Sequence, residues 1–306
     1  MIALIAGTGA LPGIIAKRLM AEGRLPAICV LEGFEPEVPP ELPRITFRLE
    51  TLGTLLAMLK EIGVTELCMA GAVQRMPIDT GKIDARTAPL VPRIAGALQK
   101  GDDGALRVIV EIFEEAGISV MGAHQLLPDL LPKGGVPTQR RPGEGHERDA
   151  RAGEAALEEM GLADLGQSVV IRNGAVLEME GPQGTAALIS EFHPKPDPGE
   201  PASDPFTWAM DGVGDMLGQA ADWLSGLEAD RASRPGAGAI LFKAPKPGQE
   251  RRADLPVIGP ETALQCAEAG FDGIIIEEGG VMVLDPDQVV ALLDRAGLFL
   301  WVRHRT

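Results

Sequence analysis

The stretch that decides the fold of the first half of this chain is MIALIAGTGALPG, residues Met1–Gly13. Ile2–Ala6 is a short, continuous apolar run, which is typical of a strand buried on both faces. A glycine-rich turn follows at residues 7–9, and Pro12 stands where the first turn of a helix tolerates proline. The stretch therefore predicts a strand, a tight turn and a helix in succession.

Apolar runs and helical patterns alternate from this start as far as residue 121. The expected strands are 2–6, 26–31, 44–49, 66–70 and 118–121, and the expected helices are 12–22, 51–62, 89–99 and 102–116. Strands separated by helices predict a parallel, Rossmann-like sheet, whose ligands bind beyond the carboxyl ends of the strands. At two of these ends the candidate phosphate-binding residues are Gly7, Thr8, Gly9, Ala10, Leu11 and Gly71. Because the turn is not a complete G-x-G-x-x-G, tight packing of the chain is the alternative.

Two further sets of candidates lie near the end of this half. Lys100, Gly101, Asp102 and Asp103 can hold a metal or a ribose, but they also fit a helix start with Asp102 as the N-cap. His124 follows the last strand, where it can bind phosphate, take part in acid–base chemistry or simply make a structural hydrogen bond.

The second half predicts a separate domain. Residues 128–145 are rich in proline, glycine and charge, which indicates a linker and gives a Rossmann-like domain at 1–132 and a second domain at 133–306. Asn173-Gly174 lies between two apolar-rich runs and predicts a hairpin. Strands and helices then alternate from residue 260 to 302, so the second domain is expected to be α/β with a mixed sheet.

Residues 191–236 differ in character and are interpreted as an insertion. Five prolines lie among acids in 193–205, and a moderately amphipathic stretch with Trp208 and Trp223 follows. Its apolar residues can touch lipid or a partner subunit, although packing in a core is the commoner role of such a stripe.

A cationic segment, ILFKAPKPGQERRADLPVIG, occupies Ile240–Gly259 of an otherwise acidic chain. Two prolines stiffen it, so its charges lose less entropy when they bind an anion. It gathers Lys243, Lys246, Arg251 and Arg252 in a short span and closes on Asp254. A carboxylate among these cations stays ionised and can hold a metal or orient water beside a phosphate. A solvated surface loop with its own counter-ion is the alternative.

Composition bounds the possible functions. A net charge of −16 and a pI of about 4.7 argue against non-specific binding of nucleic acid. The three cysteines have no metal-ligand spacing and are expected to be buried thiols. We expect a soluble, cytoplasmic protein, since the N-terminus reads as a strand rather than a signal peptide and no apolar run is long enough for a membrane span. The Walker A, G-x-S-x-G, H-E-x-x-H and cysteine–zinc patterns are absent from the sequence.

Several motifs together resemble one known family. IAGTGALP, MAGAVQRM, KGDDGALRVIVEIFEEAGISVMGAH, LADLGQSVVIRNGAVLEMEGPQGT, KAPKPGQERRADLPVIGPET and LDPDQVVALLDRAGLFLWV occur in the order seen in UDP-2,3-diacylglucosamine pyrophosphatases of the LpxI type, which act in lipid A synthesis. The resemblance covers nearly the whole chain outside 191–236. Ala72 and Gln183 depart from it, because the family often has Asn at the first position and usually has Glu at the second.

The resemblance implies an N-terminal Rossmann-like domain and a C-terminal catalytic domain that together perform Mg²⁺-dependent hydrolysis of a UDP-linked diacylated glucosamine to UMP and 2,3-diacylglucosamine 1-phosphate. It also implies that Asp254, in the DLP motif, is the essential aspartate. The catalytic candidates are Asp254, which is also the metal-ligand candidate, Lys243, Lys246 and Arg252. The substrate-binding candidates are Gly7, Thr8, Gly9, Ala10, Leu11, Gly71, Lys100, Gly101, Asp102, Asp103, His124, Gln183, Gly184, Thr185 and Gln249. Peripheral contact with the inner membrane and a homodimer complete the expectation.

Two other functions are compatible with parts of the sequence. A nicotinamide-dependent oxidoreductase explains the Rossmann-like half and can use Glu32 at the end of the second strand for a ribose, but it leaves the cationic segment unexplained. A non-catalytic sensor of nucleotide sugars needs no Asp254. Release of UMP from UDP-diacylglucosamine separates these functions from the pyrophosphatase.

Overall fold

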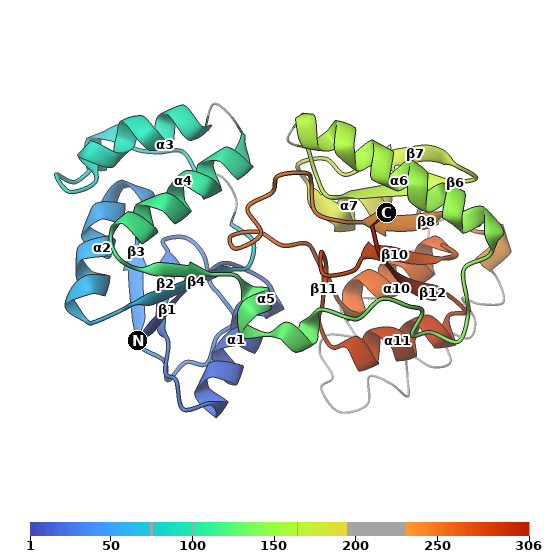
Figure 1. The fold of residues 1–306 in the computed structure, drawn as a ribbon, viewed down its shortest axis with the longest axis horizontal. Coiled ribbons are helices and arrows are strands. Elements are labelled where there is room, and N and C mark those ends of the chain that lie inside the picture. Colours follow the sequence, from blue (N-terminus) through green and yellow to red (C-terminus); the bar gives the residue numbers. More distant parts are fainter. Residues whose placement is uncertain (74–75, 99–100, 164, 195–230, 306) are drawn as a thin grey trace, which may run out of the picture. The chain divides into compact units, whose positions relative to one another are not determined.

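The computed structural model describes residues 1–73, 76–98, 101–163, 165–194 and 231–305, with the side chain of Asp102 left out. The chain forms two compact units. Unit 1 contains Met1–Asp129 and Gly248–Leu255, and unit 2 contains Leu130–Pro247 and Pro256–Thr306. Both units combine a sheet with helices on its faces (Figure 1), so the α/β fold expected for the chain is confirmed.

Unit 1 is built on a five-stranded parallel sheet in the order β3-β2-β1-β4-β5. Its strands are β1 (Ile2–Ala6), β2 (Ala27–Leu31), β3 (Arg44–Phe47), β4 (Glu66–Ala70) and β5 (Ser119–Met121). β1 pairs with β2 on one side and β4 on the other, and all of its residues except Ile5 are buried. Burial on both faces explains why the strand reads as a continuous apolar run.

The helices of unit 1 cover both faces of this sheet. They are α1 (Ala10–Ala21), α2 (Leu52–Glu61), α3 (Val91–Leu98), α4 (Asp102–Glu115) and α5 (Ala123–Leu126). Leu55 and Leu59 of α2 and Phe113 of α4 share one buried cluster with sheet residues, whereas α1 lies on the opposite face (Figure 1). The sheet is therefore a middle layer, as the alternating sequence pattern predicts.

Unit 2 has a mixed sheet in the order β12-β10-β8-β6-β7, with β8, β10 and β12 parallel and β6 and β7 antiparallel. The strands are β6 (Ser168–Arg172), β7 (Ala175–Met179), β8 (Ile240–Lys243), β10 (Gly273–Glu277) and β12 (Phe299–Arg303). Asn173 and Gly174 join β6 to β7 with φ of 55° and 78°. Two consecutive positive φ values are what a two-residue hairpin turn requires, so the predicted hairpin is confirmed.

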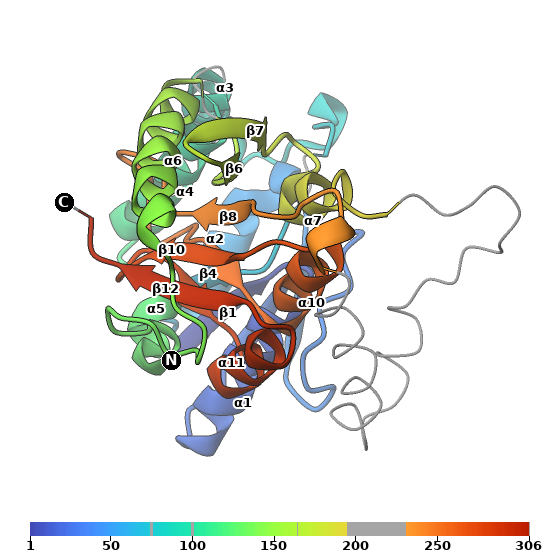
Figure 2. The ribbon, with the colours of Figure 1, turned by 90° about the vertical axis from the view of Figure 1, so that its right-hand side faces the viewer.

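Helices cover the two faces of this mixed sheet (Figure 2). They are α6 (Glu144–Leu162), α7 (Gly184–Ser190), α10 (Pro260–Ala269) and α11 (Pro286–Arg295). Along β8, Ile240 and Phe242 face the α6 cluster, while Leu241 faces the cluster of α7, α10 and α11. At Gly153 of α6 an added Cβ would lie 2.4 Å from the ring of Phe242, so only glycine permits this close approach.

Some local predictions were wrong. The expected linker is not a free connection, because residues 131–143 pack in unit 2, where Gly135 bridges to Val302 and the Thr138 hydroxyl accepts from Leu300 N. Within the alternating pattern expected after residue 260, the structure has a strand at β11 (Met282–Val283), but this strand lies outside the main sheet and pairs with β9 (Val257–Ile258) in a separate two-stranded sheet. Helix α4 has Gly101, at φ 100°, at its N-cap position instead of Asp102.

The described residues also bear on the remaining global expectations. All three cysteines are buried and free, and burial raises the pKa of the Cys29 and Cys68 thiols to about 12. Within the described part of the chain, every helix is too short or too polar to cross a bilayer. Most of the insertion expected at 191–236, including Trp208 and Trp223, lies outside the described residues.

One charged cluster stabilises the end of the unit 2 sheet where β10 and β12 begin. Asp272 accepts from Arg140 at 3.2 Å and Arg231 at 3.0 Å, and its second oxygen lies 3.4 Å from His146 Nε2. Gly143 N donates to His146 Nδ1, so the ring directs its Nε2 proton at Asp272. Burial alone would raise the pKa of the Asp272 carboxyl, but the hydrogen bond from His146 and the charge of Arg140 outweigh it and lower the pKa.

Asp272→Asn should lower the free energy of unfolding of unit 2 by about 2 kcal/mol at neutral pH, because cations lose their charged acceptor. A carboxyl whose pKa falls on folding stabilises above its unfolded pKa, near 3.8, and loses that effect as the pH falls through the folded value. The difference between wild type and variant should therefore shrink at acid pH. Urea unfolding followed by tryptophan fluorescence measures it, because Trp301 lies in β12 of unit 2. A difference that grows on acidification would contradict this account.

Candidate functional site

The glycine-rich turn after β1 and the loop after β4 meet at the carboxyl edge of the unit 1 sheet. Thr8 N donates to Ala72 O and Ala72 N donates to Thr8 O, both at 2.9 Å, and Gly7 N donates to Ala70 O. A Cβ on Gly7 would lie 2.5 Å from Ala72 O, and one on Gly71 would lie 2.7 Å from Thr8 O. Gly7 and Gly71 are thus required by the packing of the two loops against each other.

The same turn still offers a polar helix start at this edge. Gly9, at φ 94°, is the N-cap of α1, and an added Cβ would find no atom within 4 Å of it. The first N–H groups of a helix lack intrahelical partners and favour anions. Gly9, Ala10 and Leu11 therefore remain candidates for anion binding, and Gly7 and Thr8 close the turn.

His124 lies in α5, directly after β5. Its Nδ1 atom is buried and has no hydrogen-bond partner among the described residues. Burial, followed by the positive charge of Arg251, lowers the pKa of the imidazole. A structural hydrogen bond through Nδ1, one of the roles considered for His124, is not made by the described part of the chain. Within the described residues, Nδ1 of His124 thus has hydrogen-bonding capacity that no protein group uses.

Asp254 is held by the side chain of Gln249. Gln249 Nε2 donates to Asp254 Oδ2 at 2.8 Å and to the Asp254 carbonyl at 3.1 Å, and Gln249 itself is buried. Two bonds from one amide fix both the carboxylate and the backbone of the residue. The structure thus brings two candidates from the cationic segment into contact, and both belong to unit 1.

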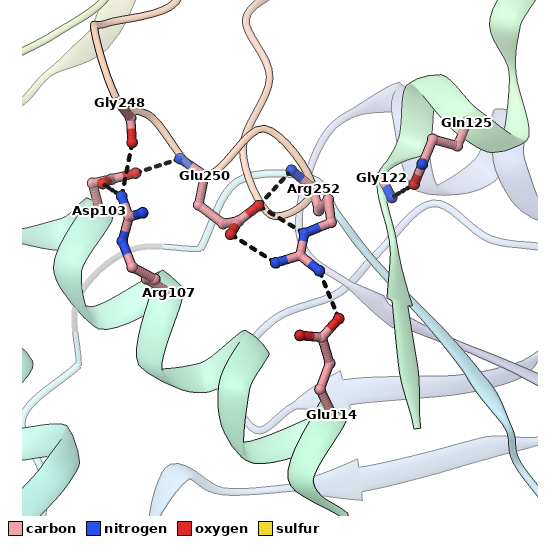
Figure 3. Close-up of polar contacts among 8 residues, drawn as sticks. All are labelled: Asp103, Arg107, Glu114, Gly122, Gln125, Gly248, Glu250 and Arg252. Atoms are coloured by element: carbon pink, nitrogen blue, oxygen red, sulfur yellow. Dashed lines mark hydrogen bonds and ion pairs between the residues drawn. The ribbon is translucent and has the colours of Figure 1, made fainter. Parts of the chain in front are cut away.

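The first turns of α4 bind Gly248 and Glu250 of the cationic segment (Figure 3). Asp103 Oδ1 accepts from Glu250 N at 2.7 Å, and Asp103 Oδ2 accepts from Arg107, which also donates to Gly248 O at 2.7 Å. The carboxylate of Asp103 therefore holds the backbone of Gly248–Leu255 at Glu250. Lys100 and the side chain of Asp102 lie outside the described residues.

Arg252 has two carboxylate partners (Figure 3). Its Nε and Nη2 donate to the two oxygens of Glu250, each at 2.9 Å, and its Nη1 donates to Glu114 Oε1 at 2.6 Å. The hydrogen bond with Arg252 is the main cause that lowers the pKa of Glu250. The guanidinium charge is thus balanced within unit 1.

In unit 2, two separately predicted motifs meet. Lys243, at the end of β8 and only 7% exposed, donates to Thr185 Oγ1 at 2.7 Å. Thr185 donates to Glu180 Oε1, so its oxygen accepts the bonds from Lys243 and from Ser168 Oγ. The cluster joins the first turn of α7 to β8 and places an ammonium group among hydroxyls and one carboxylate.

The neighbouring candidates flank this cluster. Gln183 is the N-cap residue of α7 and makes no side-chain cap bond, and Gly184 begins the helix at φ 86°. The loop after β8 packs against the end of α6, where a Cβ on Gly161 would lie 2.9 Å from Pro247 and 3.6 Å from Lys246 Cβ. The loop after β8 is therefore supported by a helix.

Sequence reasoning missed four polar residues that support these candidates: Ser168, Glu180, Glu114 and Glu250. All four lie within the family motifs, but none was predicted, because a motif does not show which of its side chains contact one another. Glu250, two residues from Arg252, was the one with a local signal, since it places an acid beside the arginine pair. Glu32, proposed for a ribose, pairs instead with Arg48 at 2.6 Å.

The described residues contain no group of three or more His, Cys, Asp or Glu side chains placed to share a metal ion. Mg²⁺ retains several waters and takes phosphate oxygens, so one or two carboxylates suffice for it. Asp254, whose orientation is fixed by Gln249, fits such an ion as a single protein ligand.

The fold and these clusters define an α/β protein with polar and cationic candidate residues at strand ends in each unit. Comparison with known proteins specifies it further. The model of the LpxI N-terminal domain matches residues 1–130, and that of the LpxI C-terminal domain matches 133–200 and 208–301. The chain is 32% identical over 298 residues to UDP-2,3-diacylglucosamine pyrophosphatase LpxI of Caulobacter vibrioides, covering 97% of this chain and 95% of the relative. The chain belongs to the LpxI family, as its motifs predicted.

Gly7→Ala should lower the free energy of unfolding by about 3 kcal/mol, because its Cβ meets backbone that a side-chain rotation cannot move away. Gly9→Ala is the matched control in the same turn. It meets no atom and should cost only about 1 kcal/mol for its positive φ. Urea unfolding followed by circular dichroism compares the two. Equal stabilities would show that Gly7 is not needed for packing.

Proposed function

We propose that this chain hydrolyses the pyrophosphate of UDP-2,3-diacylglucosamine to UMP and 2,3-diacylglucosamine 1-phosphate, a step of lipid A synthesis. The observation that carries the proposal is the match over 97% of the chain to the Caulobacter vibrioides enzyme named for this activity. The oriented Asp254 and the cations of the same segment support it from the structure.

Asp254 is the residue that we assign to the chemistry. Water attacks one phosphorus atom in line with the leaving oxygen, a P–O bond of the anhydride breaks, and the water loses a proton. A carboxylate held by Gln249 can orient that water or hold a cation beside the phosphate. Because two bonds from Gln249 restrain it, Asp254 has little freedom to lose on reaching the transition state.

Lys243 and Lys246 are the proposed cations for the pyrophosphate. Negative charge on the phosphate oxygens is redistributed during attack, and cations aimed at them stabilise the transition state. Lys243 is held by Thr185 and Lys246 lies in a loop packed on α6, so neither depends on an isolated flexible loop. His124, Gly9, Ala10 and Leu11 are the proposed substrate contacts at the carboxyl edge of the unit 1 sheet.

Mg²⁺ is the proposed cofactor, with Asp254 as its protein ligand. When bound, Mg²⁺ would offset negative charge on the pyrophosphate oxygens and so favour attack of water on phosphorus. The carboxylate of Asp254 and the substrate's own oxygens match the ligands that this ion prefers.

The substrate also bears on location. A diacylated glucosamine resides in a membrane, so an enzyme that consumes it works at the bilayer surface. We therefore propose a cytoplasmic protein that contacts the inner membrane peripherally. A homodimer is a separate part of the proposal. Three exposed apolar side chains after β4, Val73, Met76 and Ile78, are compatible with contact to acyl chains or lipid. Co-sedimentation with anionic vesicles tests the membrane contact.

Asp254→Asn should reduce kcat by about 10³-fold while KM changes little, because the lost charge acts mainly on the transition state. Release of UMP from UDP-2,3-diacylglucosamine in mixed micelles measures the rate, and circular dichroism confirms the fold. Asp287→Asn, an exposed aspartate at the start of α11, is the control and should retain full activity. Substrate binding without UMP release by the wild type would instead favour a nucleotide-sugar sensor.

Excess EDTA should abolish turnover, and added Mg²⁺ should restore it, because a doubly anionic pyrophosphate needs charge compensation. The same titration on Asp254→Asn should require more Mg²⁺ for its residual rate if Asp254 ligates the ion. Full turnover of the wild type in EDTA would remove Mg²⁺ from the proposal.

A further inference from the structure

The segment Gly248–Leu255 belongs to unit 1 although the chain on both of its sides belongs to unit 2. Such a segment needs its own attachments, because no helix or strand runs through it. The attachments are polar, and they concentrate on helix α4 (Figure 3).

The start of the segment is fixed by the first turns of α4. Arg107 donates to Gly248 O, and Glu250 N donates to Asp103 Oδ1, each at 2.7 Å. Arg107 and Asp103 also pair with each other at 2.7 Å. The main-chain groups of Gly248 and Glu250 are therefore bound by Arg107 and Asp103, which also form an ion pair with each other.

The middle of the segment is fixed by Arg252. Its planar guanidinium binds both oxygens of Glu250 within the segment and one oxygen of Glu114 on α4. Two parallel N–H···O bonds are stronger and more directional than a single bond from an ammonium group. The side chain of Glu114 on α4 is 42% exposed, so its 2.6 Å bond attaches the Arg252 guanidinium to the surface of unit 1.

The anchored part leads directly into Asp254. The carbonyl of Glu250 accepts from the N–H groups of both Ala253 and Asp254 at 3.0 Å, which closes a turn. Ala253 packs against the apolar cluster of unit 1, and Gly122 leaves room for the backbone, since a Cβ there would lie 3.2 Å from Arg252 Cα. A shift of Glu250 or Arg252 would therefore move Asp254.

We infer that Arg252, Glu250 and Glu114 form an anchor that positions Asp254, and that Arg252 is a positioning residue instead of a cation for the pyrophosphate. The inference rests on the proposed function for its kinetic part. Its structural basis is that two carboxylates already balance the charge of Arg252 and occupy three of its N–H donors.

Glu114→Gln decides between the two roles of Arg252, because they predict opposite signs. If Arg252 anchors the segment, the weakened bond should lower kcat about tenfold with KM little changed, since small displacements of a reacting group are costly. If Arg252 contacts the pyrophosphate, removing a competing carboxylate should leave the rate unchanged or raise it. Either of the latter results would overturn the inference.

Glu115→Gln is the matched control. Glu115 lies next to Glu114 on α4 and also pairs with an arginine at 2.6 Å, but that arginine is Arg93 and is not part of the segment. The same loss of charge on the same helix should therefore leave kcat unchanged.

Two more variants test whether the bidentate bond of Arg252 to Glu250 matters. Arg252→Lys keeps the charge but loses the bidentate bond, so an anchor predicts nearly the same loss of kcat as in Arg252→Gln. A charge contact with phosphate predicts that Arg252→Lys retains most of the rate. In Glu114→Gln/Arg252→Gln the loss should equal that of Arg252→Gln alone, because Glu114 acts through Arg252. Additive losses would contradict the anchor.

Limited proteolysis gives a readout that needs no enzyme activity. Trypsin cuts after Arg251 and Arg252, and mass spectrometry identifies these cuts. Glu114→Gln should raise their initial rate several-fold over wild type and Glu115→Gln, because the segment detaches more often. If the wild type releases no UMP, the proposed function fails while this result still stands. If cleavage is equal in all three proteins, the anchor is refuted whatever the kinetics.

Discussion

Parallel strands need a crossover of a dozen or more residues, and this requirement governs both units. In unit 1 the carboxyl ends of all strands therefore lie on one edge of the sheet, and a loop follows each of them. Gly7, Gly71 and Gly122 allow these loops to approach closely. In unit 2 the parallel strands β8, β10 and β12 produce one such edge, at which Lys243 ends β8. The candidate residues therefore occupy loops and strand ends, while the helices and strands behind them are apolar and fix their positions.

Charged groups in this protein are mostly engaged in pairs, in spite of the large net negative charge. Arg252 donates to two carboxylates, Asp272 accepts from two arginines and lies beside a histidine, and Lys243 donates to the Thr185 hydroxyl. Moving a buried charge away from such partners costs free energy, because its contacts offset the cost of desolvation only in one geometry. Gly248–Leu255 is thus held by specific polar contacts rather than forming a diffuse positive patch, and Gln249 orients its aspartate.

Much of the fold follows from local signals, and the parts that do not are set by contacts between distant residues. Ile2–Ala6 as a buried strand and Asn173-Gly174 as a hairpin turn depend only on neighbours in the sequence, and both were predicted. The packing of residues 131–143 on β12 depends on Thr138 and Leu300, and the place of Gly248–Leu255 depends on Arg252 and Glu114. Motifs identified the candidate residues Asp254, Lys243, Thr185 and Gln249, but the contact of Gln249 with Asp254 and the supporting residues Glu180 and Glu250 come from the fold.

The assignment of Gly248–Leu255 to unit 1 has a consequence for synthesis of the chain. Residues 1–129 leave the ribosome first, yet the piece that covers part of their apolar cluster follows only after 130–247. At usual elongation rates this delay lasts roughly ten seconds, during which Glu114 lacks its arginine and the place of Ala253 stays open. The contacts of the N-terminal family domain are accordingly complete only once the segment from the second half of the chain has been synthesised.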